Sequence, residues 1–311
     1  MYTCRRWQLW LPEPQRMLGF DFYNFWNTGR AILAGQGAYS YPLSFYPPAT
    51  AYLFALFGLL PFNLSFGLWT GLNLILFHQS VVRFQKGWRG LVWLGFAPVP
   101  FILMTGQIDI FFLWLAGFLA SSGWKAVLAG ILVTLKPQIA FIVLPWYLLQ
   151  WILHQRSQFL RWAAGTLLLH LLPLLADPLI YQKWLAVARN ESNWRMVASP
   201  GVFALTNLNI PLLPIGILAA VIVIVGLVRN PMFSRTAQLL ALPAGLWYEN
   251  VLLVGSAPWW LLVPISWAAF FAGTQVHNNY PFVLIPISCF CWQWLHKNEM
   301  GTKPEPLPGQ V

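Results

Sequence analysis

Charged side chains are scarce in this chain. Asp, Glu, Lys and Arg make up 8% of its 311 residues, whereas a soluble protein carries about 25%. So few charges cannot cover a water-facing surface, which excludes an ordinary soluble domain. Hydrophobic residues make up 58% of the sequence. They recur in blocks broken by Pro, Gly and short basic links, as in a polytopic membrane protein.

Cysteines and long basic runs are also few. The three cysteines, Cys4, Cys289 and Cys291, form neither a disulfide framework nor a zinc pattern. The last two are predicted to be small buried hydrophobes. No basic run is longer than Arg5-Arg6, so the net charge of +10 needs no nucleic-acid partner. The first 20 residues hold two prolines and four charges and are too polar to span a bilayer.

The apolar blocks predict an all-α integral membrane bundle with about 8 to 11 transmembrane or half-crossing helices. Twelve helical residues rise about 18 Å, less than the hydrocarbon core of about 30 Å, so the shorter blocks are predicted to cross only half-way or at a tilt. We expect one domain over residues 1–296 and a disordered polar tail over 297–311. The blocks lie at residues 49–60, 62–82, 90–104, 108–122, 125–136, 138–153, 159–176, 211–228, 236–255, 257–273 and 279–295.

Short basic links set the expected orientation, because Lys and Arg beside membrane helices favour the cytoplasm. Placing these links in the cytoplasm leaves the unusual polar residues on the opposite, extracytoplasmic face. That face is expected to hold a first loop at 1–48, a loop at 177–210, Gln107, Lys136 and Glu249. The basic links contain Arg83, Lys86, Arg89, Lys125, Arg156, Arg161, Arg229 and Arg235.

Only eight acidic residues are present, so the candidate acids can be enumerated. Asp177 precedes Pro178 and favours a turn. Asp109 lies just inside a predicted helix, where a carboxylate complements the N-terminal dipole, and a chemical role stays open for it. Asp21 and Glu249 are the stronger site candidates, because an ionisable group at membrane depth is costly.

Two of the charged candidates have alternative interpretations. Asp21 opens a polar and aromatic segment, where it is either part of a reaction site or the N-cap of a helix predicted at 22–34. Lys136 sits beside Pro137 in an apolar block. It is either a cation that snorkels to an interface or a buried cation that awaits an anion. Arg30 lies in the same segment as Asp21.

An ordered series of motifs carries a family resemblance. It opens with DFYNFW, GRAILAGQGAYSY, FYPPATAYLFALFGLLPF and LWTGLNL. It continues with GQIDIFFLWLAGFLA, AGILVTLKPQIAFIVLPWYLL, a long loop and GLWYENVLLV. Over residues 19–255 the series resembles glycosyltransferase family 87. These are polyprenol-phosphate-mannose-dependent alpha-mannosyltransferases, integral membrane enzymes of the GT-C class.

The resemblance implies a lipid-linked sugar donor, an inverting transfer and an extracytoplasmic active site in a multi-pass cell-membrane protein. The family's essential first-loop aspartate maps onto Asp21. Its later polar pair maps onto Tyr248 and Glu249, where the family more often shows an Asp than a Glu. Family members carry a transmembrane helix before the first loop, and none is visible before Asp21. An N-terminally truncated member is therefore one expectation.

The implied chemistry gives each candidate a role. A carboxylate within hydrogen-bond reach activates an acceptor hydroxyl, so Asp21 is predicted to be the general base. The transferred group is expected to be a hexose, with mannose as the first choice, and the acceptor a lipid or glycan. The polyprenyl phosphate leaves as an anion that needs fixed cations; Lys136 and Arg30 are the candidates. Tyr46 is a candidate to stack on sugar, and Gln107 shares the expected face. Without an acidic pair, no metal or other cofactor is predicted.

Two other classes of protein stay open. A transporter or flippase of lipid-linked sugars predicts inverted repeats with matching broken helices, and the sequence has no convincing internal repeat. A non-catalytic, truncated homologue would keep the fold without the transfer.

Overall fold

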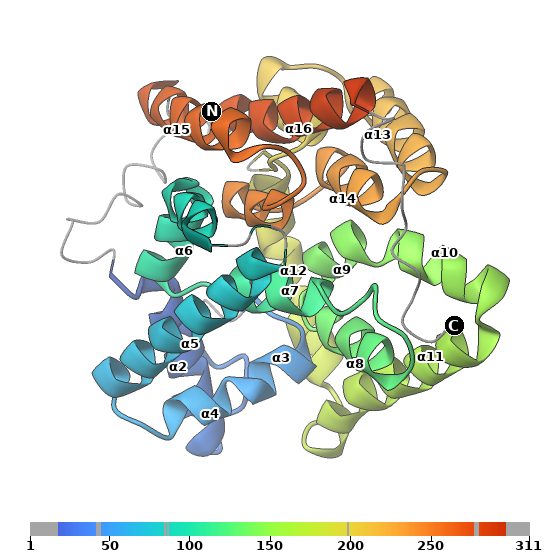
Figure 1. The fold of residues 1–311 in the computed structure, drawn as a ribbon. Helices are drawn as coiled ribbons and strands as arrows, with labels where there is room; N and C mark the ends of the chain where they lie inside the picture. Colours follow the sequence, from blue (N-terminus) through green and yellow to red (C-terminus); the bar gives the residue numbers. More distant parts are fainter. Residues whose placement is uncertain are drawn as a thin grey trace.

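The computed structural model describes residues 18–41, 45–83, 85, 87–197, 199–276 and 280–296. In this part of the chain every regular element is a helix and no strand occurs (Figure 1). The predicted all-α class is therefore confirmed. The predicted tail at 297–311 lies outside the described residues.

The first helices form a bent pair. Helix α2 (Phe20–Leu33) is followed by α3 (Pro48–Leu53) and α4 (Ala55–Gly58), and α5 (Phe62–Val82) turns away from the α3–α4 segment by 116°. Helices α2 and α4 cross at Gly29 and Gly58, where the two backbones touch. Small residues at a crossing let membrane helices approach this closely.

Proline and glycine break the middle of the chain into short helices. Gly106 adopts a left-handed conformation at φ 79° and ends α6, and proline begins α9 and α10 because its fixed φ suits a first helical position. The elements are the 3-10 helix η2 (Gly87–Gly95), α6 (Pro98–Thr105), α7 (Asp109–Ala116), α8 (Trp124–Val133), α9 (Pro137–Val143), α10 (Pro145–His154), α11 (Arg156–Leu171) and η3 (Leu172–Leu175).

Two expectations about the second half need correction. The polar stretch 177–210 is not simply a loop, because it contains α12 (Ile180–Val197) and η4 (Val202–Leu208). The block 236–255 is not one helix, because it divides between α14 (Pro231–Leu240) and η5 (Trp247–Leu253). The remaining elements are α13 (Leu212–Leu227), α15 (Trp259–Val276), η6 (Tyr280–Val283) and α16 (Leu284–Leu295).

Few of the helices are long enough to cross a bilayer. Among the described residues, Arg156–Leu175 and Trp259–Val276 have the length and hydropathy of a span, and the bent pair 48–58 with 62–82 is a third candidate. Shorter apolar helices such as α13 surround them. A membrane bundle of spanning and partly crossing helices accommodates this pattern, since irregular backbone is tolerated where protein covers it.

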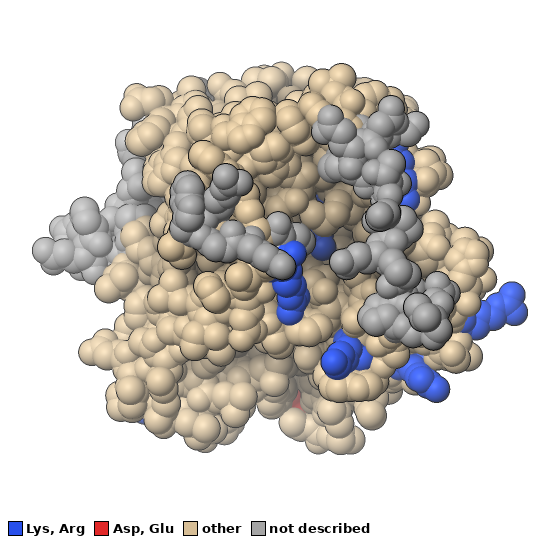
Figure 2. All heavy atoms as spheres, viewed as in Figure 1, with Lys and Arg blue, Asp and Glu red and all other residues tan. Residues whose placement is uncertain are grey.

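One face of the bundle is basic. Figure 2 shows Lys and Arg side chains on this face with almost no acidic atoms, and a hollow near its middle. Arg156 and Arg161 are exposed, as expected of residues in basic links. Arg235 is not part of an exposed link, because it is 4% exposed within α14. Cys289 is buried as predicted, whereas Cys291 is exposed.

Candidate active site

The start of α2 is fixed against the end of α6, and this contact positions Asp21. The Gly19 amide donates to the Met104 carbonyl at 2.7 Å, and Phe22 packs where Gly106 has no side chain. Gly19, not Asp21, caps α2, and no side chain bonds the cap. The N-cap interpretation of Asp21 is therefore wrong: its carboxylate instead lies beside the side chains of Gln107 and Thr105.

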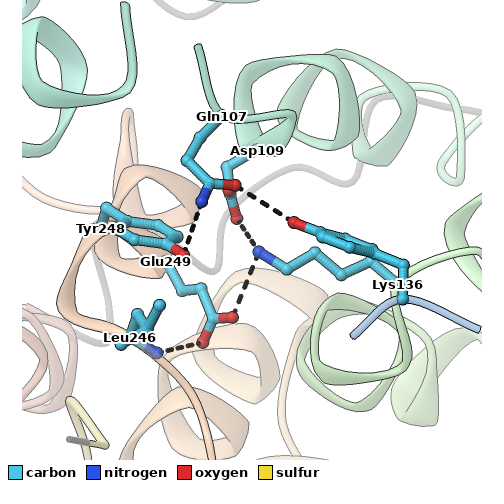
Figure 3. Close-up of polar contacts among 7 residues, drawn as sticks. Gln107, Asp109, Lys136, Leu246, Tyr248 and Glu249 are labelled. Atoms are coloured by element: carbon cyan, nitrogen blue, oxygen red, sulfur yellow. Dashed lines mark hydrogen bonds and ion pairs between the residues drawn. The ribbon is translucent and has the colours of Figure 1, made fainter. Parts of the chain in front are cut away.

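Gln107 connects three parts of the chain. The Tyr46 hydroxyl donates to Gln107 Oε1 at 3.1 Å, and Gln107 Nε2 donates to the Tyr248 hydroxyl at 2.9 Å. Figure 3 shows this amide between α7 and η5, with Tyr248 on one side. Together with its bond to Asp21, Gln107 brings the first segment, the α6–α7 turn and η5 to one place.

Beside Gln107 lies a buried ionic cluster, which we call the Lys136 cluster: Asp109, Lys136 and Glu249. Lys136 Nζ lies 2.6 Å from Asp109 Oδ1 and 3.3 Å from Glu249 Oε1 (Figure 3). The exposed fractions are 0% for Asp109, 3% for Lys136 and 1% for Glu249. Three elements meet here, because Asp109 begins α7, Lys136 precedes α9 and Glu249 lies in η5.

The Lys136 cluster changes two predictions. Lys136 is buried, as one interpretation predicted, and two carboxylates of the chain already contact it. Asp109 does begin a helix, yet it is also the nearest partner of Lys136. Sequence reasoning underrated Asp109, although two opposite charges in neighbouring apolar blocks were a signal that they pair. Asp109 Oδ2 has no hydrogen-bond partner among the described residues.

Gly245 leaves room for the Glu249 carboxylate. The Leu246 amide donates to Glu249 Oε2 at 3.3 Å. A Cβ built on Gly245 would collide with that same oxygen. Gly245 could not be singled out from the sequence, because the crowding arises only when the Glu249 side chain of η5 folds back over it.

Asp21 differs from the buried acids in its environment. It is partly exposed, whereas Asp109 and Glu249 are sealed. It lies on α2, outside the helices of spanning length. Desolvation raises the pKa of Asp21 to about 6, against the lowering effect of its bonds to Gln107 and Thr105. A carboxyl with this pKa ionises just below neutral pH, which suits proton transfer.

Arg30 lies apart from the other predicted residues. Its guanidinium is exposed and stacks over Trp26, 5.5 Å from the ring centroid. It is nine residues beyond Asp21 on α2, which corresponds to about 13 Å along a helix. The structure therefore joins Asp21, Gln107, Tyr46, Tyr248 and the Lys136 cluster, but does not join Arg30 to them.

The arrangement combines the Asp21 carboxylate, several hydroxyl and amide groups, and a buried ammonium. Among the described residues, no group of three His, Cys, Asp or Glu side chains is placed to hold a metal ion. An apolar groove of about 430 Å³ between α5 and η2 is lined by Phe77, His78 and Leu91, among others. Its lining includes no residue of this site.

A helical membrane-type fold with such a site indicates a membrane transferase, and comparison with known families agrees. The profile of glycosyltransferase family 87 matches residues 45–256, more than half of the chain. The chain therefore belongs to glycosyltransferase family 87 and is a membrane glycosyltransferase. The match contains Tyr46 and the whole Lys136 cluster, and Asp21 precedes it. Searches of curated proteins and of solved structures found no match to the chain.

Proposed function

We propose that this protein transfers a hexose, mannose in the first instance, from a polyprenyl-phosphate donor to a lipid or glycan acceptor, with inversion at the anomeric carbon. The reaction takes place on the extracytoplasmic face of the cell membrane. The observation that carries the proposal is the meeting of a partly exposed Asp21 with Gln107 beside the buried Lys136 cluster.

Asp21 acts as the general base. Its carboxylate accepts the proton of the acceptor hydroxyl as that oxygen attacks the anomeric carbon, and the bond from this carbon to the phosphate oxygen breaks. Gln107 and Thr105 orient the carboxylate. The leaving phosphate is a stable anion, so no general acid is required. Tyr46, whose ring packs edge-on against Phe25, supplies an aromatic and hydroxyl surface for the sugar.

Lys136 contributes the positive charge for the leaving phosphate. An ammonium has three donors, and the two carboxylates engage two of them. The third donor remains for a phosphate oxygen once the donor lipid enters. In this proposal Arg30, which stacks over Trp26, contacts the lipid-linked donor further from the reacting atoms. Lys136→Met should therefore weaken donor binding more than acceptor binding, and unchanged donor affinity would contradict this role.

The test of the base is Asp21→Asn in purified protein supplied with polyprenyl-phosphate mannose. We expect correct folding and a loss of about 100-fold or more in transfer, as for a positioned base. Asp177→Asn is the matched control. The Asp177 carboxylate pairs with Lys183 Nζ at a distance of 2.6 Å and takes no part in the site. Near wild-type transfer by Asp21→Asn would refute the role of Asp21. No transfer by the wild-type protein would favour a transporter or a non-catalytic homologue.

A further inference from the structure

A second buried cation lies in the bundle at Arg235, and no carboxylate pairs with it. Among the described residues the ion pairs involve Lys136 and Lys183 only. Arg235 Nη1 donates to the Leu252 carbonyl at 3.2 Å, while its Nε has no partner. Burying an unpaired charge costs several kcal/mol. An anion bound to the guanidinium would offset this cost.

The same side of α14 carries further polar groups without partners. Gln238 is fully buried, and neither its amide nitrogen nor its amide oxygen has a partner. Ser234 is 2% exposed, and its hydroxyl also has none. At about 100° per residue, positions 234, 238 and 235 fall within one arc of about 100°. Buried polar atoms are nearly always hydrogen-bonded. A polar ligand bound at this side of α14 would supply the missing hydrogen-bond partners.

The surroundings of Arg235 supply no compensating charge. Tyr147 of α10 and Cys289 of α16 are its titratable neighbours, and a phenol and a thiol are ordinarily neutral at pH 7. Figure 2 shows a hollow near the middle of this face, between the positions of α14 and α9 in Figure 1. Helices α14 and α9 are packed neighbours.

We propose that Arg235 and Gln238 form a second anion site that takes a phosphate group. A guanidinium binds phosphate through two parallel hydrogen bonds, and the Gln238 amide adds a donor at the next turn. Arg235 takes no part in the ion pairs of the Lys136 cluster; it bonds the Leu252 carbonyl and neighbours Tyr147 instead. The phosphate comes either from a phospholipid headgroup at the basic face or from a free phosphate compound.

The experiment measures thermal unfolding of the purified protein in phosphate-free detergent as inorganic phosphate is added, with chloride at matched ionic strength as reference. We expect saturable stabilisation of the wild type. Arg235→Met and Gln238→Leu should raise the half-saturating phosphate concentration about tenfold or more, as for lost hydrogen bonds to a charged group. Arg156→Met, which removes an exposed charge, should change nothing.

If Arg235→Met does not fold, Gln238→Leu still provides the test, because it removes an amide that has no hydrogen-bond partner among the described residues. Native mass spectrometry separates the two sources of phosphate. A phospholipid retained by the wild type and lost in the variants identifies a headgroup, and phosphate stabilisation without retained lipid identifies a free compound. Absence of both in the wild type, or equal phosphate affinity in wild type and Gln238→Leu, would overturn the proposal.

Discussion

At the scale of single residues, the site separates two kinds of carboxylate. Asp109 and Glu249 are sealed and neutralise Lys136, whereas Asp21 is partly exposed and keeps polar rather than cationic partners. With Asp21 ionised, the site holds three carboxylates and one ammonium. Desolvation, with a smaller contribution from the charge of Asp109, raises the Asp21 pKa and favours proton uptake, which is what a general base does.

The pH dependence of transfer should report Asp21. Its pKa is raised to about 6 by desolvation, so its neutral form persists to a higher pH than in water. Only the ionised form accepts a proton, and the rate should therefore fall as pH drops through about 6. The measurement is initial transfer rate between pH 5 and 8. The residual rate of Asp21→Asn should lack this step, and a flat wild-type profile would contradict the assignment.

The Lys136 cluster should behave as one energetic unit. Lys136→Met leaves Asp109 and Glu249 buried without a counter-ion, a change that costs about 3 to 5 kcal/mol. Asp109→Asn in the same chain should recover part of the loss, because it removes one of the stranded charges. The measurement is chemical unfolding of the two single variants and the double variant in detergent. Strictly additive losses would show that the residues are not coupled.

At the scale of elements, the crossing of α2 over α4 determines where Asp21 lies. A Cβ at Gly29 would collide with the carbonyl oxygen of Phe54, and one at Gly58 would collide with the backbone of Gly29. Backbone cannot rotate away as a flexible side chain can. Any side chain at this crossing must therefore push α2 outward, and α2 carries the carboxylate.

Gly29→Ala should accordingly lower both stability and transfer. The matched control is Gly71→Ala in α5, where an added Cβ meets no atom within 4 Å and alanine is the better helix former by about 1 kcal/mol. Thermal unfolding and transfer rate are compared for the two variants. Equal behaviour of the two would show that the crossing tolerates separation.

Elements with clear boundary signals were predictable from the sequence, and contacts between distant segments were not. Helix α5 occupies the predicted block 62–82, because Pro61 precedes it and Arg83 follows it. Of the site, Asp21 and Glu249 stood out as acids among apolar residues. The opposite charges of Lys136 and Asp109 in neighbouring apolar blocks signalled a pair, but a separation of 27 residues could not specify the 2.6 Å contact itself. Arg235 resembled a link residue only because Arg229 and Pro231 are close to it in sequence.

At the scale of the whole molecule, the basic links and the site should face opposite sides of the membrane. The Lys136 cluster, Gln107 and Asp21 meet in one place, which a single site requires, since reacting groups must be held within a few ångströms. On the face that Figure 2 shows, Lys and Arg side chains outnumber acidic ones. Positive residues favour the cytoplasm, so the site should open on the other side.

Single cysteines at Gln85 and Ser192, in a chain lacking the three native cysteines, should test this orientation. Intact cells are treated with a membrane-impermeant thiol reagent before and after lysis. We expect labelling of position 192 in intact cells and labelling of position 85 only after lysis. The reverse pattern, or labelling of both before lysis, would remove the basis for an extracytoplasmic site.

The Lys136 cluster also has a consequence for how the protein is made. Its members leave the ribosome in the order Asp109, Lys136, Glu249, so the first two charges are able to neutralise each other before η5 exists. Glu249 arrives last, and its solitary charge is costly in lipid until Lys136 receives it. The final docking of η5 is thus a checkpoint in assembly.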